Sequence, residues 1–290
     1  MPTLERLARQ TAAIQSILGI VRTMKALAAV NIPAAERAAE SASAFHETVL
    51  DGLSMARRAL PRAEAGPPTR GAPPRIAIAF GTDHGLCGGF NEAVAQTAIG
   101  IAGHARVFAV GGRIAGAVER GGRPVDRIFR AAAASDGLRG LAAELILALD
   151  AASQTAAPHV DLIHQTRTPG GKTAVERARL LPLGDAFLAD LARRPWPGRR
   201  LPMLPADASA IFRSLTRQHL AISLYRAGAR SLAAEHTTRL ALMSHAEKEL
   251  DRRLDEVGSA HRRLRQAHIT DELLDIVSGF EAIGASSTEV

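Results

Sequence analysis

Aromatic residues, cysteines and long apolar runs are all scarce in this 290-residue sequence. Aromatic residues make up 3% of the chain, which argues against a protein that stacks nucleic-acid bases on aromatic platforms. The single cysteine, Cys87, excludes an internal disulfide and agrees with a reducing compartment. No uninterrupted apolar run comes near the ~18 residues of a membrane-spanning helix, and the first residues lack the apolar core of a signal peptide. The sequence therefore predicts a soluble chain that meets a membrane only through partners.

Positive charge is in excess, with a formal net charge of +7 and a sequence pI near 10.7. Such an excess can serve nucleic acid, an anionic membrane surface or an acidic protein partner. Because the charge is spread along the chain, we expect no nucleic-acid partner. Many alanines contribute to the 47% hydrophobic share, which suits helices that pack closely through small side chains.

Residues 207–284 are predicted to form one long helix, because they contain no proline and carry an apolar stripe at steps of three and four. This spacing is typical of a coiled-coil seam. At about 1.5 Å per residue such a helix would span roughly 110 Å, which is more than a compact domain of this size can enclose. It therefore needs a partner along its length. The stripe consists of Ile211, Leu215, Gln218, Ile222, Tyr225, Ala229, Leu232, His236, Arg239, Met243, Ala246, Leu250, Leu254, Val257, His261, Leu264 and His268.

The N-terminal segment, residues 1–60, is the predicted partner helix. Its own apolar stripe cannot be buried alone, and the two helices must be antiparallel if both leave and return to the same globular body. Pro33 lacks a backbone N–H, so we expect it to kink or break this arm into two pieces. The stripe consists of Leu7, Ile14, Leu18, Val21, Met24, Leu27, Ala28, Ala35, Ala39, Ala42, Phe45, Val49, Leu53 and Leu60.

Residues 75–195 are predicted to form an α/β domain between two proline-rich linkers, residues 61–74 and 193–205. Strands are expected at 75–80, 104–110, 125–130, 160–165 and 172–183, with helices at 93–102, from 113 to about 120, and at 138–151. Alternating strands and helices favour a mostly parallel sheet covered by helices. The predicted fold class is therefore α/β plus a long antiparallel coiled coil, with a Rossmann-like parallel sheet domain inserted between the N- and C-terminal helices.

The glycine-rich loop 81–91 lies between a predicted strand and a helix, where phosphate-binding loops occur. A Walker loop requires lysine and then serine or threonine after its last glycine, but Phe90 follows Gly89. The spacing of Gly85, Gly88 and Gly89 does not match the dinucleotide fingerprint, and no acidic residue follows the second strand. We therefore interpret the glycines as making a tight turn and a close helix approach.

Other candidate chemistry is sparse, and no catalytic residue is predicted. Asp83 and His84 could form an acid–base pair, but such neighbours in a loop are more often a turn and cap arrangement. Cys87 at an apolar junction is more often a packed side chain than a reactive thiolate. The ten histidines show no pair or triad with metal-ligand spacing, so neither a metal nor a cofactor is expected.

Several motifs resemble the gamma subunit of F-type ATP synthases. Residues 82–91, T-D-H-G-L-C-G-G-F-N, are similar to the family's (S/T)-D-R-G-L-C-G-G-x-N, in which Asp83, Gly85, Cys87, Gly88, Gly89 and Asn91 are matched. Residues 234–243 resemble S-E-x-x-A-R-M-x-A-M, and residues 265–273 resemble R-Q-A-x-I-T-x-E-L. Residues 275–279 resemble E-I-V-x-G, and residues 20–30 resemble I-T-K-A-M-x-M-V-A-A. The motifs occur in the family's order, while about 100–200 carries none.

The resemblance implies a non-catalytic central rotor shaft inside a ring of alpha and beta subunits, with the globular part on epsilon and a c-ring. It implies a Rossmann-like domain that binds no nucleotide, and a peripheral location at the cytoplasmic face of a bacterial inner membrane. By motif match, Arg265, Gln266, Thr270 and Glu272 would contact beta-subunit loops, with Met24 and Arg239 nearby on the shaft. An arginine-rich band, with Arg252, Arg253, Arg262 and Arg263 beside Arg265, could meet acidic beta loops.

Departures from the family pattern mark the chain as a divergent member. His84 stands where the family has arginine, and residues 261–264 read H-R-R-L instead of Y-N-K-A. Two other classes stay open from the residues alone. One is a nucleotide-binding enzyme that uses the loop 81–91, and the other is a coiled-coil adaptor.

Overall fold

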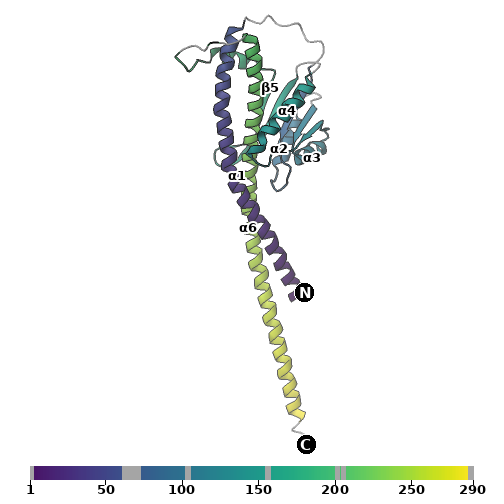
Figure 1. The fold of residues 1–290 in the computed structure, drawn as a ribbon. Helices are drawn as coiled ribbons and strands as arrows, with labels where there is room; N and C mark the ends of the chain where they lie inside the picture. The colour runs from purple at the N-terminus through teal and green to yellow at the C-terminus, as the bar shows by residue number, and fades with distance from the viewer. Residues whose placement is uncertain are drawn as a thin grey trace. The chain divides into compact units, whose positions relative to one another are not determined.

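The computed structural model describes residues 3–60, 73–101, 106–153, 158–199, 203 and 207–286, with side chains up to residue 277 (Figure 1). Most of the linker 61–74, part of the linker 193–205 and the side chains of the last helical turns lie outside the described residues. The helices are α1 (Leu4–Ala59), α2 (Phe90–Ile99), α3 (Gly112–Arg120), α4 (Leu138–Ala152), α5 (Asp185–Arg193) and α6 (Ala208–Ser286), with a 3-10 turn at Ser135–Gly137. The strands are β1 (Arg75–Phe80), β2 (Arg106–Val110), β3 (Arg127–Phe129), β4 (His159–Arg167) and β5 (Thr173–Leu181).

The chain forms two compact units. One consists of Met1–Ala26 with Ala241–Val290, and the other of Leu27–Leu240. Both α1 and α6 contribute to both units. This division by contacts differs from the sequence-based division into two arms and a middle domain, which remains a prediction.

The larger unit is built on a five-stranded sheet in the order β3-β2-β1-β4-β5. β1 pairs in parallel with both β2 and β4, and β2 pairs in parallel with β3, whereas β4 and β5 are antiparallel. The prediction of a mostly parallel sheet is confirmed. The turn at residues 169–171 joins the one antiparallel pair, with Gly170 and Gly171 at positive φ.

Alternate residues of β1 face opposite sides of the sheet, because successive side chains of a strand point in opposite directions. Ile78 and its alternates pack with α4 and α6, where Leu145 and Leu224 are buried. Ala77 and Ala79 face α2 and α3 and share their core with Ile114. Both faces are therefore covered, as expected for parallel strands with continuous apolar sequences.

Within the larger unit, α1 and α6 run antiparallel. Ala35 packs with Leu232, while the later pair Gly52 and Leu215 are close enough that a Cβ on the glycine would lie 3.2 Å from Leu215 Cδ1. α5 adds Leu191 to the apolar cluster between the two helices. This helix is not among the predicted elements. The predicted antiparallel pairing is confirmed here.

The smaller unit holds the start of α1 against the second half of α6. Lys25 Nζ lies 2.7 Å from Glu247 Oε2, and Arg22 bridges Glu247 and Asp251 one turn further along α6. The earlier residue of α1, Arg22, thus reaches the later residue of α6, Asp251, so this pair of helices is also antiparallel. Buried residues recur every seven positions along α1, which is the period of a coiled-coil seam. They are Leu7, Ile14, Val21, Ala28, Ala35, Ala42, Val49 and Ala56.

Three expectations for α1 need correction. The helix runs through Pro33 without interruption, so the break into two pieces is wrong. Ala35, fully buried against α6, holds the chain helical just after the proline, so tertiary packing offsets the lost hydrogen bond. Leu27 and Phe45, both predicted on the buried stripe, are more than half exposed.

The third correction concerns hydropathy. An 18-residue window of α1 reaches a mean hydropathy of 1.4, enough by length and composition for a membrane span. Counting only uninterrupted apolar runs overlooks this window. Only 22% of that window is buried, because Leu18, Val21 and Ala28 face the seam while Ile17, Ile20 and Val30 are exposed. The seam with α6 therefore covers only part of the apolar surface of α1.

Candidate functional site

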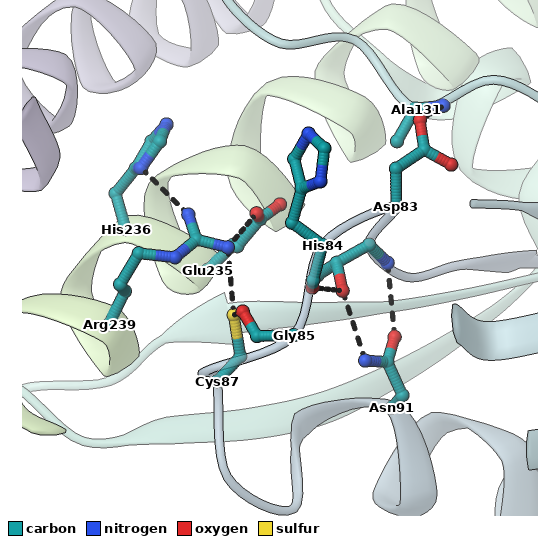
Figure 2. A network of polar contacts seen from close by, with 10 residues as sticks. Asp83, His84, Gly85, Cys87, Asn91, Ala131, Glu235, His236 and Arg239 are labelled. Atoms are coloured by element: carbon teal, nitrogen blue, oxygen red, sulfur yellow. Dashed lines mark hydrogen bonds and ion pairs between the residues drawn. The ribbon is translucent and has the colours of Figure 1, made fainter. Parts of the chain in front are cut away.

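The glycine-rich loop between β1 and α2 is held closed by its own polar groups (Figure 2). Asn91 Oδ1 accepts the Thr82 backbone N–H at 3.0 Å, and Asn91 Nδ2 donates to Thr82 Oγ1 at 3.0 Å. The Thr82 hydroxyl in turn donates to the His84 carbonyl at 2.6 Å. Leu86 and Gly88 adopt positive φ between these anchors, as a tight turn requires. The tight turn agrees with the interpretation of the loop, while the close approach to a helix is seen at Gly81, where an added Cβ would clash with Ile114 Cβ of α3, and not at Gly89.

Asp83 joins three separate loops. Its Oδ1 accepts the Gly112 N–H at 2.8 Å at the start of α3, and its Oδ2 accepts the Ala131 N–H at 2.9 Å. Both carboxylate oxygens are thus bonded to backbone, and Asp83 acts as a turn and cap residue. Figure 2 shows no contact between the His84 ring and the Asp83 carboxylate, and both carboxylate oxygens have backbone partners instead, so the two do not form an acid–base pair.

The loop is tied to α6 by a buried polar cluster, the Arg239 cluster, formed by Cys87, Glu235, His236 and Arg239 (Figure 2). Arg239 Nη2 donates to Glu235 Oε1 at 2.6 Å and to Cys87 Sγ at 2.9 Å. Arg239 Nη1 lies 3.4 Å from His236 Nδ1. The side chains of Glu235 and Arg239 are each 12% exposed, so the pair is almost withdrawn from water.

Burial dominates the electrostatics of this cluster. It raises the pKa of the Cys87 thiol to about 11, against the opposing effect of Arg239, so the sulfur is a thiol and not a nucleophilic thiolate at neutral pH. Burial also raises the pKa of Glu235, although Arg239 opposes this shift. The pKa of His236 falls to about 4, because of burial and then of Arg239. His236 Nε2 is buried without a hydrogen-bond partner among the described residues.

The carboxyl ends of the parallel strands, where α/β sheets bind ligands, are closed by internal contacts. The strand order reverses between β1 and β4, and there Gln165 Nε2 donates to the Phe90 carbonyl at 2.8 Å. Gly111 (φ +113°) brings the loop after β2 so close that a Cβ would lie 2.6 Å from the Thr82 carbonyl carbon. The cavity beside Gly81 and Glu235 has a volume of about 10 Å³, too small for a nucleotide. The arrangement joins α6 to the sheet.

Replacing Asn91 by alanine should lower the free energy of unfolding by about 1–3 kcal/mol, because the buried Thr82 N–H would lose its acceptor. Urea unfolding of the full chain measures this. The exposed Gln96, also on α2, provides a matched control, and Gln96→Ala should stay within about 0.5 kcal/mol. Equal effects of the two substitutions would contradict the role given to Asn91.

The other predicted site residues lie on the paired helices of the smaller unit. Met24 is half-buried on α1. From Arg265 to Val277 every described side chain of α6 is exposed, including the four predicted contact residues. Thr270 Oγ1 donates to the Gln266 carbonyl at 2.9 Å, and Glu272 lies 3.7 Å from His268. Arg239 is different, since its guanidinium is bonded inside the larger unit.

The predicted arginine band is partly neutralised within α6. Arg252 pairs with both Glu249 and Glu256, and Arg253 also pairs with Glu249. Glu249 is partly exposed, and hydrogen bonds from these two arginines lower its pKa to about 2. The remaining arginines of the band, Arg262, Arg263 and Arg265, form no ion pair among the described residues and are exposed.

The site is thus a sheet whose ligand-binding edge is closed by internal contacts, together with two long antiparallel helices. A family model described as ATP synthase matches residues 3–283. The ATP synthase gamma chain of Granulibacter bethesdensis is 27% identical over 98% of this chain and 100% of its own length. That of Brucella anthropi is 25% identical with the same coverage.

Solved structures show the same fold. The rotor of the Euglena gracilis mitochondrial ATP synthase aligns with a TM-score of 0.63 at 12% identity, covering 92% of this chain and 98% of that one. The central stalk and c-ring structure of the Tetrahymena thermophila enzyme aligns with a TM-score of 0.55 at 18% identity, covering 78% and 99%. The chain belongs to the ATP synthase gamma-chain family, as the sequence motifs indicate. Its members are the non-catalytic stalk subunit of a membrane-associated complex.

Proposed function

We propose that this chain is the central rotor shaft of an F-type ATP synthase. It couples ion-driven rotation of a c-ring to ATP synthesis or hydrolysis in a hexamer of alpha and beta subunits. One observation carries the proposal in addition to the family. On α6 a half-buried seam continues to Leu264, and from Arg265 to Val277 the helix is exposed on all sides. A helix that buries nothing gains no stability from packing, so this end requires a partner outside the chain.

The exposed end of α6 has the chemistry of a sliding contact. Arg265, Gln266, Thr270 and Glu272 are the residues proposed to meet the beta-subunit loops, with Met24 on α1 as a further contact. Exposed polar and ionic contacts are each worth about 0–1 kcal/mol, so they can break and re-form as the shaft turns. Apolar residues follow on the same exposed segment, and an apolar collar would cover them. They are Ile269, Leu273, Leu274, Ile276 and Val277.

Arg239 has a different part in this proposal. Its motif places it among the contact residues, yet its guanidinium is bonded to Glu235 and Cys87. We propose that it fixes the loop 81–91 to α6, so that torque on the sheet domain is passed to the helix. The sheet domain would sit with epsilon on the c-ring, at the cytoplasmic face of a bacterial inner membrane.

Co-purification tests the proposal directly. A tagged copy expressed in the native host should bring down alpha, beta and epsilon subunits and a c-ring in stoichiometric amounts. Isolated chain titrated with ATP, ADP or NAD should give no saturable heat. Recovery of the chain without any alpha or beta subunit would refute the rotor function.

Replacing Gln266 by alanine should lower coupled turnover of the assembled complex about two- to tenfold, the cost of one or two hydrogen bonds. The stability of the chain itself should not change, since Gln266 is exposed. Gln218→Ala is the matched control, because Gln218 is an exposed glutamine of α6 in the other unit. Turnover that is the same in both variants would refute the contact role of Gln266 and leave the rotor assignment standing.

A further inference from the structure

A cavity of about 190 Å³, lined by apolar side chains together with histidines and arginines, lies within the larger unit between α1, α5, α6 and the strands β4 and β5. It is separate from the Arg239 cluster and shares no residue with it. Three buried histidines, His46, His164 and His219, contribute to its wall, one from each of α1, β4 and α6.

Hydrogen bonding determines the tautomers of two of these histidines. Arg226 Nη1 lies 3.0 Å from His46 Nδ1, and because a guanidinium only donates, His46 Nδ1 must accept. His46 Nε2 therefore carries the proton and donates to His219 Nδ1, which lies 2.9 Å away. The proton of His219 must then be on Nε2. That N–H has no acceptor among the described residues, and unlike His236 Nε2 it is not a fully enclosed atom.

Positive charge around the cavity exceeds negative charge. Arg179, Arg226 and Arg230 line it, and Glu176 is the one carboxylate among the residues lining it. Glu176 is already shared, lying 3.5 Å from Arg230 and 3.9 Å from His164 Nε2. Arg226 forms no ion pair within the described parts of the chain, and burial and then Arg230 lower its pKa.

Glu176 and Glu47 oppose the lowering of the Arg226 pKa, but neither forms an ion pair with Arg226 among the described residues. Glu47, next to His46 on α1, is bonded to Arg194, as is Asp51. A half-buried guanidinium without a carboxylate is costly unless another anion satisfies it. Neutral imidazoles cannot do so, and the pKa values of His46 and His219 are both lowered to about 4, first by burial.

We propose that this cavity binds a small oxyanion, of which inorganic phosphate is the representative, between the Arg226 guanidinium and the Nε2–H of His219. Arg226 supplies charge-assisted hydrogen bonds and His219 a neutral donor. The size fits, because a water molecule occupies about 30 Å³ in the liquid and the cavity could hold a phosphate together with some water. The anion would join α1 to α6 at the level of the sheet. This site is independent of the proposed rotor function.

Calorimetric titration of the full chain with sodium phosphate at neutral pH tests the proposal. Saturable binding of one phosphate per chain is expected, with sulfate competing and chloride binding more weakly. Arg226→Gln should weaken binding by about tenfold or more, since it removes the charge. Arg213→Gln is the matched control, an exposed arginine of α6 whose hydrogen bond is to Ser209, and it should bind phosphate like the native chain.

A second measurement uses the native chain, so it does not require any variant to fold. In the native chain labelled with nitrogen-15 at histidine, phosphate should shift the Nε2 signal of His219 with the same saturation as the heat. The exposed His245, labelled in the same sample, reports non-specific effects of phosphate. The absence of saturable heat and of a His219 shift would overturn the proposal, and so would equal phosphate affinity of the Arg226→Gln and Arg213→Gln chains.

Discussion

Replacing Arg239 by methionine should lower the free energy of unfolding of this chain by about 3–5 kcal/mol at neutral pH. The change removes the cation that Glu235 faces and leaves a carboxylate whose side chain is 12% exposed without its ion-pair partner. It also removes the donor to Cys87 Sγ that ties the glycine-rich loop to α6. Urea unfolding of the full chain, followed by circular dichroism, measures the loss.

Two further variants test whether the unpaired charge of Glu235 causes this loss of stability. Arg239→Met combined with Glu235→Gln should be clearly more stable than Arg239→Met alone, because no unpaired charge is then buried. Arg252→Met, which breaks exposed ion pairs of the same helix, should cost no more than about 1 kcal/mol. A loss for Arg239→Met as small as that for Arg252→Met would contradict the buried ion pair.

The pH dependence of Arg239→Met gives an independent check. Burial already raises the pKa of Glu235, and loss of Arg239 removes the effect that opposes this rise. A carboxyl with a raised pKa in the folded state contributes stability below its unfolded pKa and loses it as pH increases through the folded pKa. The deficit of the variant should therefore shrink towards acidic pH.

Lowering the pH from 6.5 to about 4 should destabilise the native chain by several kcal/mol through its buried histidines. His46, His219 and His236 have folded pKa values lowered from 6.5 to about 4, in each case first by burial. A group whose folded pKa is depressed stabilises the fold above its unfolded pKa, and this contribution is lost as pH falls towards the folded pKa. Each such shift corresponds to at most about 3 kcal/mol.

A comparison of single variants measures how much of this acid destabilisation comes from His236. The unfolding free energy of His236→Gln should fall less steeply between pH 6.5 and 4 than that of the native chain, since one depressed group is gone. His245→Gln, at an exposed position on the same helix, is the matched control and should follow the native curve. Carboxylates titrate in the same way in all three chains, so their contribution cancels in the difference. If the unfolding free energy fell equally steeply with pH in all three chains, protonation of His236 would not destabilise the fold.

Local pattern in the sequence determined most of the elements, the family and the pairing of the helices, but not α5 or the continuity of α1. A seven-residue period along residues 7–56 is enough to predict a coiled-coil seam, because heptads place one face of a helix against a partner. Alternation of apolar strands with helices predicts a mostly parallel sheet. The motif at residues 82–91 identifies the loop and, with the C-terminal motifs, the gamma-chain family. These features depend on residues that are close in the sequence and lie within one helix, strand or loop.

The tertiary structure decided which distant groups meet. Arg239 and Cys87 are 152 positions apart and His46 and His219 are 173 apart, and nothing in the local sequence of either pair indicates a partner. The continuity of α1 through Pro33 was decided in the same way, by burial of Ala35 against α6. Local propensity acts within a few residues, whereas these contacts depend on the register of two packed helices against a sheet. The register depends on all the packing contacts of the core together. The buried clusters therefore follow from the tertiary structure and not from the local sequence.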